Sequence, residues 1–548
     1  MFPAVYLLPL MLLSGLSSES TATQSDNSTG KKYFIVLPEN IASYHPIPPK
    51  NQIYVTALYN DTSVTIIQHT YNTRTVTMQA AESRDFILDG RLELGKAAIS
   101  NNVLEITSTK EITIQAISFR NSSIQTALVI PTDKLAKKYL IPPIPQIQGS
   151  TLLADVVTTL VTERAPFKLI IVNGDKANKI TVKGNVLKEV NLQPKQVAQI
   201  WVREKEALRV VEATQPVAVL FGHPCAIQSK CNCGLLYTML SPARDETLKF
   251  FIPSTFPWED ETKILLSETG SAKIEAFSPD SPLIKVAGTA ILYHPKLLLT
   301  LIPETDFACC YVVTPIPDMQ NYAVIVVHKD QTEGVHVGKN PHQGSEWTEL
   351  KGTDYVSTKI TVQPRATPDS SISTTIIWHA SSKMAVYFLG QDSNSIFGNP
   401  APVISKSPAD YRGCVLIPGV IKIGDNADGW RESLKYCRDK DMELICLSEA
   451  KSQPQATKRL SELNNGNLQE VWIGMRQSSL TGEYYWVNED PVKSTNWQNG
   501  EPSIETSHKC VLMGAKSDKD FSWRSEDCCK AFHPVCYTET EILESWDD

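Results

Sequence analysis

Cysteine has the most reactive side chain in this sequence, and its spacing is the clearest chemical signal. Cys225, Cys231 and Cys233 lie close together after an apolar stretch, with His223 beside them. Three sulfurs and an imidazole form a conceivable zinc-binding set. Clustered cysteines in an exported protein more commonly form a local disulfide. We therefore expect Cys225 and Cys231 to take part in a local disulfide, and we expect no metal.

The remaining cysteines do not divide evenly. Cys309 and Cys310 are adjacent, and a bridge between neighbours would be strained. Of the 12 cysteines, five lie within residues 225–310 and seven within residues 414–536. Because both numbers are odd, either one bridge connects the two groups, or two thiols stay free or pair between chains.

Catalytic motifs are missing from suitable positions. The sequence has no Gly-x-Ser-x-Gly elbow, His-Glu-x-x-His pair or phosphate-binding glycine loop in a suitable setting. The acidic run Glu259, Asp260 and Glu261 is typical of a solvated surface, rather than of a general acid and base. We predict a binding protein and not an enzyme.

Composition and the first residues indicate an exported globular protein. The 548 residues, 42% of them hydrophobic, suffice for three or four packed domains. A net charge of −8 without a basic patch does not favour nucleic acid as a partner. The apolar run over residues 1–16, followed by small residues, is typical of a signal peptide and too short to span a bilayer. We expect a signal peptide over residues 1–18, no transmembrane segment, and a secreted, extracellular protein.

Glycosylation signals agree with export. Asn27, Asn60 and Asn121 each begin an Asn-x-Ser/Thr sequon. Residues 19–30, rich in Ser, Thr and Asn, are expected to form a flexible lead-in, and residues 538–548 an acidic tail.

Residues 31–389 alternate apolar and polar side chains. The alternation is clear in four short stretches, Val64–Ile66, Val76–Met78, Ile180–Val182 and Ile360–Val362. A period of two is typical of strands with one buried face. Turn residues such as Asn173 and Gly174 separate the stretches. The pattern predicts an all-β region.

The same region contains an internal repeat. Pro131 is followed eleven residues later by Pro142, and Pro242 is followed after the same interval by Pro253. Similar strands precede both pairs, and a third, weaker copy of that strand begins at His379. Self-similarity of this kind indicates repeated structural units. We predict two or three β-sandwich-like units, with boundaries at about residues 31–140, 141–250 and 251–389, and a linker over residues 390–412.

A different pattern follows the predicted linker. Trp430, Leu434 and Cys437 recur at i, i+4 and i+7, which predicts a short helix. Three apolar strands are then expected, at Val471–Gly474, Tyr485–Val487 and Cys510–Met513. A polar loop over residues 488–509 separates the second strand from the third.

This succession of a helix cysteine, a Trp-Ile-Gly strand, an Asn-Trp…Gly-Glu-Pro loop and closing cysteines resembles the C-type lectin-like domain, over residues 413–537. The resemblance implies an α+β fold in which Cys437 pairs with Cys536 and Cys510 with Cys528. The predicted fold class is therefore mostly β, with repeated β-sandwich-like units followed by an α+β lectin-like domain.

One further bridge is expected inside the lectin-like region. We favour Cys414 with Cys446, which leaves Cys529 as the candidate for an outside partner.

The resemblance also bears on calcium, which sugar-binding members of the family hold in this loop through six to eight oxygen ligands. Glu501 is retained, but Ser503 stands at an Asn position and His508 at or near an acid position. Arg524 and Ser525 stand where the family has Asn-Asp. We expect no cofactor, with calcium as the less favoured alternative.

The long loop is the ligand-binding face that the resemblance implies. The candidate contact residues are Trp497, Glu501, Ser503, His508, Arg524 and Ser525. Trp497 has an alternative role as a core residue beneath the loop. The cationic side chains of this set have two roles open to them, contact with acidic groups such as sulfate or sialic acid, and simple solvation.

The first part of the chain resembles a second family. Lys31–Ile35, Ile53–Thr56 and Thr62–Ile66 are similar to the opening of the N-terminal domain of IgGFc-binding protein, over residues 31 to about 400. The resemblance implies an extracellular, adhesive all-β module. It assigns no antibody-binding residue in this chain.

The function predicted from these features is that of a secreted recognition or adhesion protein. It would bind a glycan or an extracellular protein through residues 488–528. The alternative is a structural component of mucus, cuticle or matrix that acts by protein–protein contacts. The odd cysteine numbers also leave a homo-oligomer open.

Overall fold

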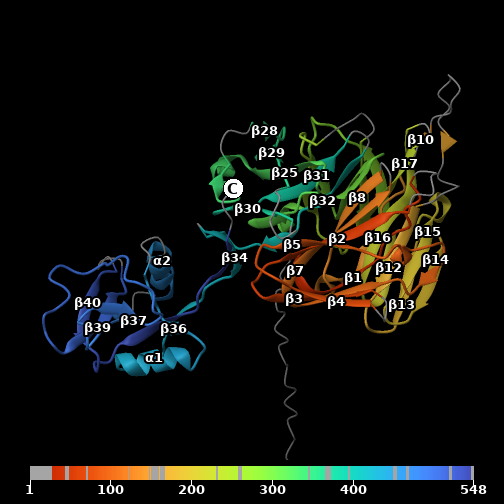
Figure 1. Ribbon diagram of the computed structural model, residues 1–548. Coiled ribbons are helices and arrows are strands. Elements are labelled where there is room, and N and C mark those ends of the chain that lie inside the picture. The colour runs from red at the N-terminus through yellow and green to blue at the C-terminus, as the bar shows by residue number, and fades with distance from the viewer. Residues whose placement is uncertain are drawn as a thin grey trace, which may run out of the picture. The chain divides into compact units, whose positions relative to one another are not determined.

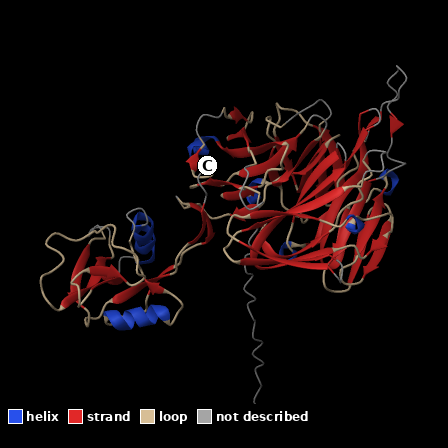
Figure 2. Cartoon of the chain, viewed as in Figure 1, coloured by secondary structure: helices blue, strands red, loops and turns tan. Residues whose placement is uncertain are grey.

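The computed structural model describes residues 28–544, apart from residues 43–47, 69–71, 121–122, 147, 150–158, 161–166, 230–231, 257–261, 343–345, 365–371, 393–394, 411, 449–452, 465–467 and 517–520. The chain divides into two compact units. The first comprises Met1–Val337, Pro341–Ile377 and Ser382–Lys406, and the second comprises Gly338–Asn340, Trp378–Ser381 and Ser407–Asp548. Strands dominate, and both described α-helices lie in the second unit (Figure 2). The predicted mostly-β fold is confirmed.

The first unit begins with an antiparallel sheet. Its strands are β1 (Gly30–Ile35), β2 (Lys50–Ala57), β3 (Thr62–Gln68), β4 (Asn72–Met78), β5 (Ser83–Ile87), β7 (Leu104–Arg120) and β8 (Ser123–Val129). The order is β4-β3-β7-β2-β5, and β1 and β8 also pair with β7. The long strand β7 is therefore the organising strand of the sheet.

A second sheet repeats this topology. Its strands are β9 (Ala136–Leu140), β12 (Phe167–Asn173), β13 (Asn178–Lys183), β14 (Leu187–Leu192), β15 (Val197–Val202), β16 (Val210–Ser229) and β17 (Asn232–Met239). The order is β14-β13-β16-β12-β15, with β9 and β17 on the long strand β16. The short β6 (Ile99–Ser100) from the first repeat extends this sheet beside β15. Another short pair, β10 (Gln148–Gly149) and β11 (Thr159–Leu160), lies apart from it.

Two further sheets have the same strand order as the central strands of the first sheet. One of them consists of β19 (Lys263–Glu268), β20 (Ser271–Ala276), β22 (Gly288–His294) and β23 (Leu297–Thr300), while β18 (Leu248–Phe251) and β21 (Leu283–Val286) pair in a separate two-stranded sheet. The remaining strands are β24 (Cys310–Val313), β25 (Gln320–His328), β26 (Val335–Val337), β27 (Asn340–Pro341), β28 (Thr348–Glu349), β29 (Tyr355–Thr361), β30 (Thr375–His379), β31 (Ala385–Gln391), β32 (Ile396–Pro400) and β33 (Val403–Ser405). The orders β20-β19-β22-β23 and β29-β25-β31-β32 match β5-β2-β7-β8 of the first sheet. The predicted third unit, residues 251–389, thus contains strands of four sheets, since β18–β31 divide among a two-stranded, a four-stranded and two five-stranded sheets.

Four strands from four different sheets, β8, β17, β23 and β32, form a ring. β8 contacts β17, β17 contacts β23, β23 contacts β32, and β32 contacts β8. β8, β17 and β32 are labelled in Figure 1. The two ends of the first unit also meet, because the backbone N–H of Ser28 donates to the Val403 carbonyl at 2.9 Å. In return, the Val403 N–H donates to Ser28 Oγ at 3.1 Å. The four sheets therefore form one closed assembly.

Strands of the first unit extend into the predicted linker, residues 390–412. β32 pairs with β31 and β33 pairs with β24, so the β region continues through residues 390–406. The linker prediction was wrong for these residues, because their apolar side chains pack in the ring despite a turn-like composition.

The second unit is built on one main sheet. Its elements are β34 (Gly413–Ile417), β35 (Ile421–Ile423), α1 (Trp430–Arg438), β36 (Glu443–Leu444), α2 (Gln453–Asn464), β37 (Glu470–Gln477), β38 (Tyr484–Trp486), β39 (His508–Gly514), β40 (Trp523–Asp527), β41 (His533–Tyr537) and β42 (Glu541–Glu544). The sheet order is β35-β41-β37-β39-β40. β42 pairs with β34, so part of the predicted acidic tail is a strand.

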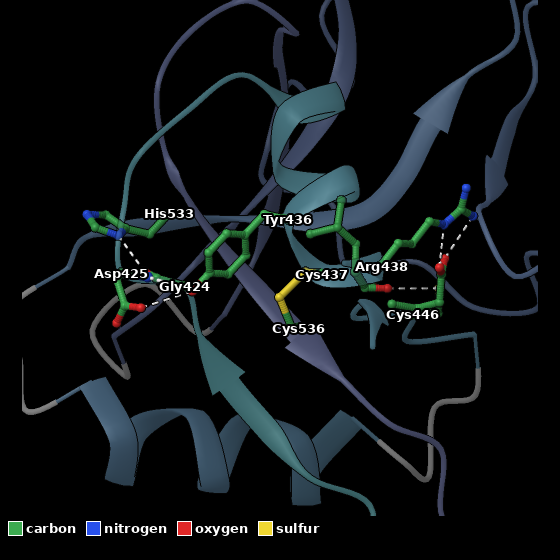
Figure 3. Close-up of a disulfide and its surroundings, with 10 residues drawn as sticks. Gly424, Asp425, Tyr436, Cys437, Arg438, Cys446, His533 and Cys536 are labelled. Atoms are coloured by element: carbon green, nitrogen blue, oxygen red, sulfur yellow. Dashed lines mark hydrogen bonds and ion pairs between the residues drawn. A yellow bond between two sulfur atoms is a disulfide. The ribbon is translucent and has the colours of Figure 1, made fainter. Parts of the chain in front are cut away.

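Disulfides and tryptophans connect the elements of this unit. Cys437 in α1 is bonded to Cys536 in β41 (Figure 3), and Cys510 to Cys528, as predicted. The Trp430 indole donates to the Ile473 carbonyl at 2.8 Å and therefore holds α1 against β37.

The other cysteine predictions need correction. Cys225 is bonded to Cys233, and Cys231 lies outside the described residues. Cys414 is disulfide-bonded while Cys446 is a free thiol, so the Cys414–Cys446 bridge is wrong. The Cys446 sulfur instead contacts the Leu444 carbonyl at 3.4 Å.

Two other predictions concern the surface. Asn60 is exposed in a turn, whereas Asn27 and Asn121 lie outside the described residues. Among the helices that the structure describes, none has the length and apolar character needed to cross a membrane.

Candidate functional site

The long loop of the second unit runs from the end of β38 to the start of β39. Its middle is fixed to β40 by backbone hydrogen bonds. The Trp523 N–H donates to the Asn496 carbonyl at 2.7 Å, and the Gln498 N–H donates to the Trp523 carbonyl at 2.8 Å. The loop is therefore positioned by the sheet even though residues 488–507 contain no strand.

The Glu501 side chain accepts several hydrogen bonds within the loop and from β40. Its Oε2 accepts from the Ser503 N–H at 2.9 Å, the Ser525 N–H at 2.8 Å and the Ser525 hydroxyl at 2.7 Å. Ser525 is 1% exposed, and its Oγ also accepts from the Ser503 N–H at 2.7 Å. These bonds bring together three predicted site residues. One oxygen of this carboxylate therefore holds the loop to β40.

Trp497 lies beneath this loop. Its ring packs edge-on against Tyr484 at 4.9 Å and Trp523 at 5.9 Å between centroids. The indole is half-buried and adjoins the core of the unit. These contacts favour the core role over the ligand-contact role for Trp497.

Arg524 faces two carboxylates. Its Nε and Nη2 donate to the two Glu470 oxygens at 2.8 and 2.7 Å, and its Nη1 donates to Glu526 at 2.6 Å. The hydrogen bonds that Arg524 donates to Glu470 raise the pKa of the guanidinium above its ordinary value. The positive charge of Arg524 is thus already compensated within the unit.

Glu526 is the centre of this charged cluster. Burial disfavours its ionised form, but hydrogen bonds from Arg524, Lys530 and the Asp527 N–H outweigh burial and lower the pKa of the carboxyl to about 2. His508 Nε2 lies 3.1 Å from Glu505 and 3.6 Å from Glu526. The predicted His508 and Arg524 are therefore linked through Glu526.

Glu470 and Glu526 were missed by sequence reasoning. Glu526 stands two residues after Arg524, and residues i and i+2 of a strand share a face, so that signal was present. Glu470 comes from β37 and reaches Arg524 only through the sheet. Within the described residues, no group of three or more His, Cys, Asp or Glu side chains is arranged to hold a metal.

Two aliphatic side chains at loop tips are almost fully exposed. Ile504 in the long loop is 100% exposed, and Leu480 between β37 and β38 is 97% exposed. Ile504 directly follows Ser503, which is fixed to β40. A fixed loop therefore presents an apolar side chain to solvent.

Comparison with known proteins agrees with this architecture. Residues 426–538 match the Lectin C-type domain family. The second unit carries a C-type lectin domain. This lectin domain is 24% identical over 107 residues to C-type mannose receptor 2 of Homo sapiens, which covers 20% of this chain and 7% of the receptor. The carbohydrate-recognition domain of the mouse scavenger receptor C-type lectin is 19% identical, with a TM-score of 0.20 over 23% of this chain and 92% of that chain.

The first unit has its own relatives. Residues 125–276 match the IgGFc binding protein family. IgGFc-binding protein of Homo sapiens is 23% identical over 384 residues, which covers 63% of this chain and 7% of that protein. The chain thus spans only a small part of the length of these curated relatives. Both resemblances seen in the sequence are confirmed.

Proposed function

We propose that this protein is a secreted recognition protein that binds a glycan or an extracellular protein through the long loop of its lectin domain, without calcium. The bonding of Glu501 carries the calcium part of the proposal. The exposed Ile504 is the reason for placing the ligand-binding surface at this loop. The β sheets of the first unit serve as the scaffold.

Calcium would require oxygen ligands that are occupied or absent here. It takes six to eight oxygens. Glu501 Oε2 already accepts three hydrogen bonds from the protein, so this oxygen is engaged in holding the loop. Arg524, next to Ser525 in sequence, brings a positive charge rather than an oxygen.

Thermal unfolding of the full chain, with and without calcium, tests this part. Calcium at about 10 mM is ten times the Kd of weak extracellular sites, and it would stabilise a binding unit by about 1.4 kcal/mol. We expect the melting temperature in calcium to equal that in chelator. A calcium-dependent rise of several degrees, or sugar capture that chelator abolishes, would contradict the proposal.

The exposed residues of the long loop indicate where a ligand would bind. Residues 504–507 are all exposed and lie between the fixed Ser503 and the start of β39. An exposed aliphatic side chain on a fixed segment costs little entropy to bury, and burial of such groups is favourable by about 1.5–3 kcal/mol.

Arrays of glycans and of secreted proteins, probed with the full chain, test the face. For each ligand captured, Ile504→Ser should weaken binding about tenfold. Leu480→Ser is the matched control, because it changes an equally exposed aliphatic residue in another loop. Equal effects of the two substitutions, or none, would place the binding face elsewhere.

Export is tested separately. Expression in a secretory host should release the chain with a glycan at Asn60, which mass spectrometry of tryptic peptides would detect. Retention of all of the chain inside the cell, with Asn60 unmodified, would contradict secretion.

A further inference from the structure

A cavity of about 390 Å³ opens where the strands of the ring end. Its lining comes from the residues at or just beyond the ends of β8, β17, β23 and β32, including Ile130, Leu240, Leu301 and Ala401. Since all four sheets contribute, the cavity is a product of the closed ring. Its volume is in the range of pockets that bind small molecules.

The inner wall of the cavity is apolar. Leu240, Leu301 and Ala401 are 4%, 2% and 1% exposed. The hydroxyls of the two threonines in the wall, Thr238 and Thr300, are hydrogen-bonded to each other at 2.9 Å. The Thr300 hydroxyl also donates to the Met239 carbonyl at 3.0 Å. The wall thus offers dispersion contacts and few unmet hydrogen bonds.

Charged side chains line another part of the wall. Arg244 Nη2 donates to both Asp306 oxygens at 2.8 Å, and these side chains are 30% and 26% exposed. Lys134 is 13% exposed at its side chain and lies 3.5 Å from Asp133. The acids outside the lining that contact these cations, Asp133 and Glu246, are 59% and 62% exposed.

The lining therefore contains two cations and one acid. Within the lining the cations outnumber the acids by one, and the ion pairs that Lys134 and Arg244 form with the exposed Asp133 and Glu246 are weak because water solvates those carboxylates. An apolar wall with a partly exposed cationic edge complements a molecule with an apolar body and a negative head.

We propose that this cavity binds a small amphipathic acid, with its aliphatic chain among the strand ends and its carboxylate near Lys134 and Arg244. This site is independent of the lectin domain.

Calorimetric titration of the full chain with decanoate, below its micelle concentration, tests the proposal. Decyltrimethylammonium is the matched probe, because it has the same chain length and the opposite charge. Decanoate should bind saturably at one site, and decyltrimethylammonium should bind at least about tenfold more weakly, since a charge-assisted hydrogen bond is lost. Absence of decanoate binding, or equal affinity for both probes, overturns the proposal.

Two substitutions locate the site. Ala243→Phe places a ring in the cavity and should abolish decanoate binding. Lys134→Met should weaken it about fivefold to tenfold, whereas Lys285→Met, at an exposed position outside the lining, should have no effect. If Ala243→Phe does not fold, the two lysine variants decide. Unchanged binding in a folded Ala243→Phe, or equal loss in both lysine variants, overturns the assignment.

Discussion

The carboxylate of Glu501 accepts hydrogen bonds from two backbone N–H groups and a hydroxyl, contributed by Ser503 and Ser525. In the family pattern that the sequence resembles, these positions hold calcium ligands. Here short hydroxyl side chains allow the backbone to reach the carboxylate. At the scale of a residue, the retained acid thus serves as a structural acceptor that holds the loop to β40.

Glu501→Gln should destabilise the lectin domain. The amide keeps one carbonyl oxygen, but its NH₂ group would face donors, so we expect a loss of about 1–3 kcal/mol in the free energy of unfolding. Urea denaturation followed by tryptophan fluorescence measures it. Glu505→Gln is the control, because that side chain is 65% exposed. Equal stability of the two variants would show that the Glu501 bonds contribute nothing.

Acid should destabilise the lectin domain through Glu526. Its pKa in the folded chain is about 2, below the ordinary value of 4.5. A lowered pKa means that the stabilisation is fully present above pH 4.5 and is lost as the pH falls towards 2. Urea midpoints between pH 5 and 2 should fall, and Arg524→Met should flatten that fall. A profile that Arg524→Met leaves unchanged would contradict this assignment.

At the scale of elements, a buried tyrosine marks the start of three of the four repeats. Tyr33, Tyr139 and Tyr311 are each at most 1% exposed, and their hydroxyls donate to the carbonyls of Ile112, Val217 and Met384. The hydroxyls thus connect β1 to β7, β9 to β16, and β24 to the residue that directly precedes β31. In the third repeat, Phe250 stands at the corresponding position.

Tyr139→Phe tests this connection. The Tyr139 hydroxyl also accepts from the Ala136 N–H at 2.9 Å, and burial raises its pKa to about 12, so it remains a donor at neutral pH. Removal leaves two backbone groups without this partner and should cost about 1–3 kcal/mol. Thermal unfolding measures the loss. Tyr322→Phe removes an exposed hydroxyl bond to Gln320 and should have little effect; comparable losses would refute a special role for Tyr139.

At the scale of the whole chain, closure of the ring joins residues that are far apart in sequence. Ser28 and Val403 exchange hydrogen bonds across a sequence separation of 375. A closed set of sheets leaves fewer exposed strand edges than an open one. The first unit should therefore depend on its earliest described residues.

Shortening the chain tests closure. A protein that begins at Lys32 lacks Ser28 and should melt at least about 2 °C below one that begins at Ser28, because two closing hydrogen bonds are lost. Limited proteolysis should also cut the shorter protein sooner within residues 396–405. Identical melting and cleavage would show that the ring does not need this contact.

Local patterns determined much of this protein. Helix α1 follows from the spacing of Trp430, Leu434 and Cys437, and the alternating stretches of the first unit are strands. Periodicity is read from neighbouring residues, so it survives without knowledge of the fold. The bridges Cys437–Cys536 and Cys510–Cys528 followed from the family resemblance.

Only the tertiary structure decided which distant groups meet. It paired Cys225 with Cys233, placed Glu470 against Arg524, and enclosed a cavity between four strand ends. Each of these contacts depends on the packing of separate strands. A sequence records what each strand is made of, while the free energy of packing selects its neighbours.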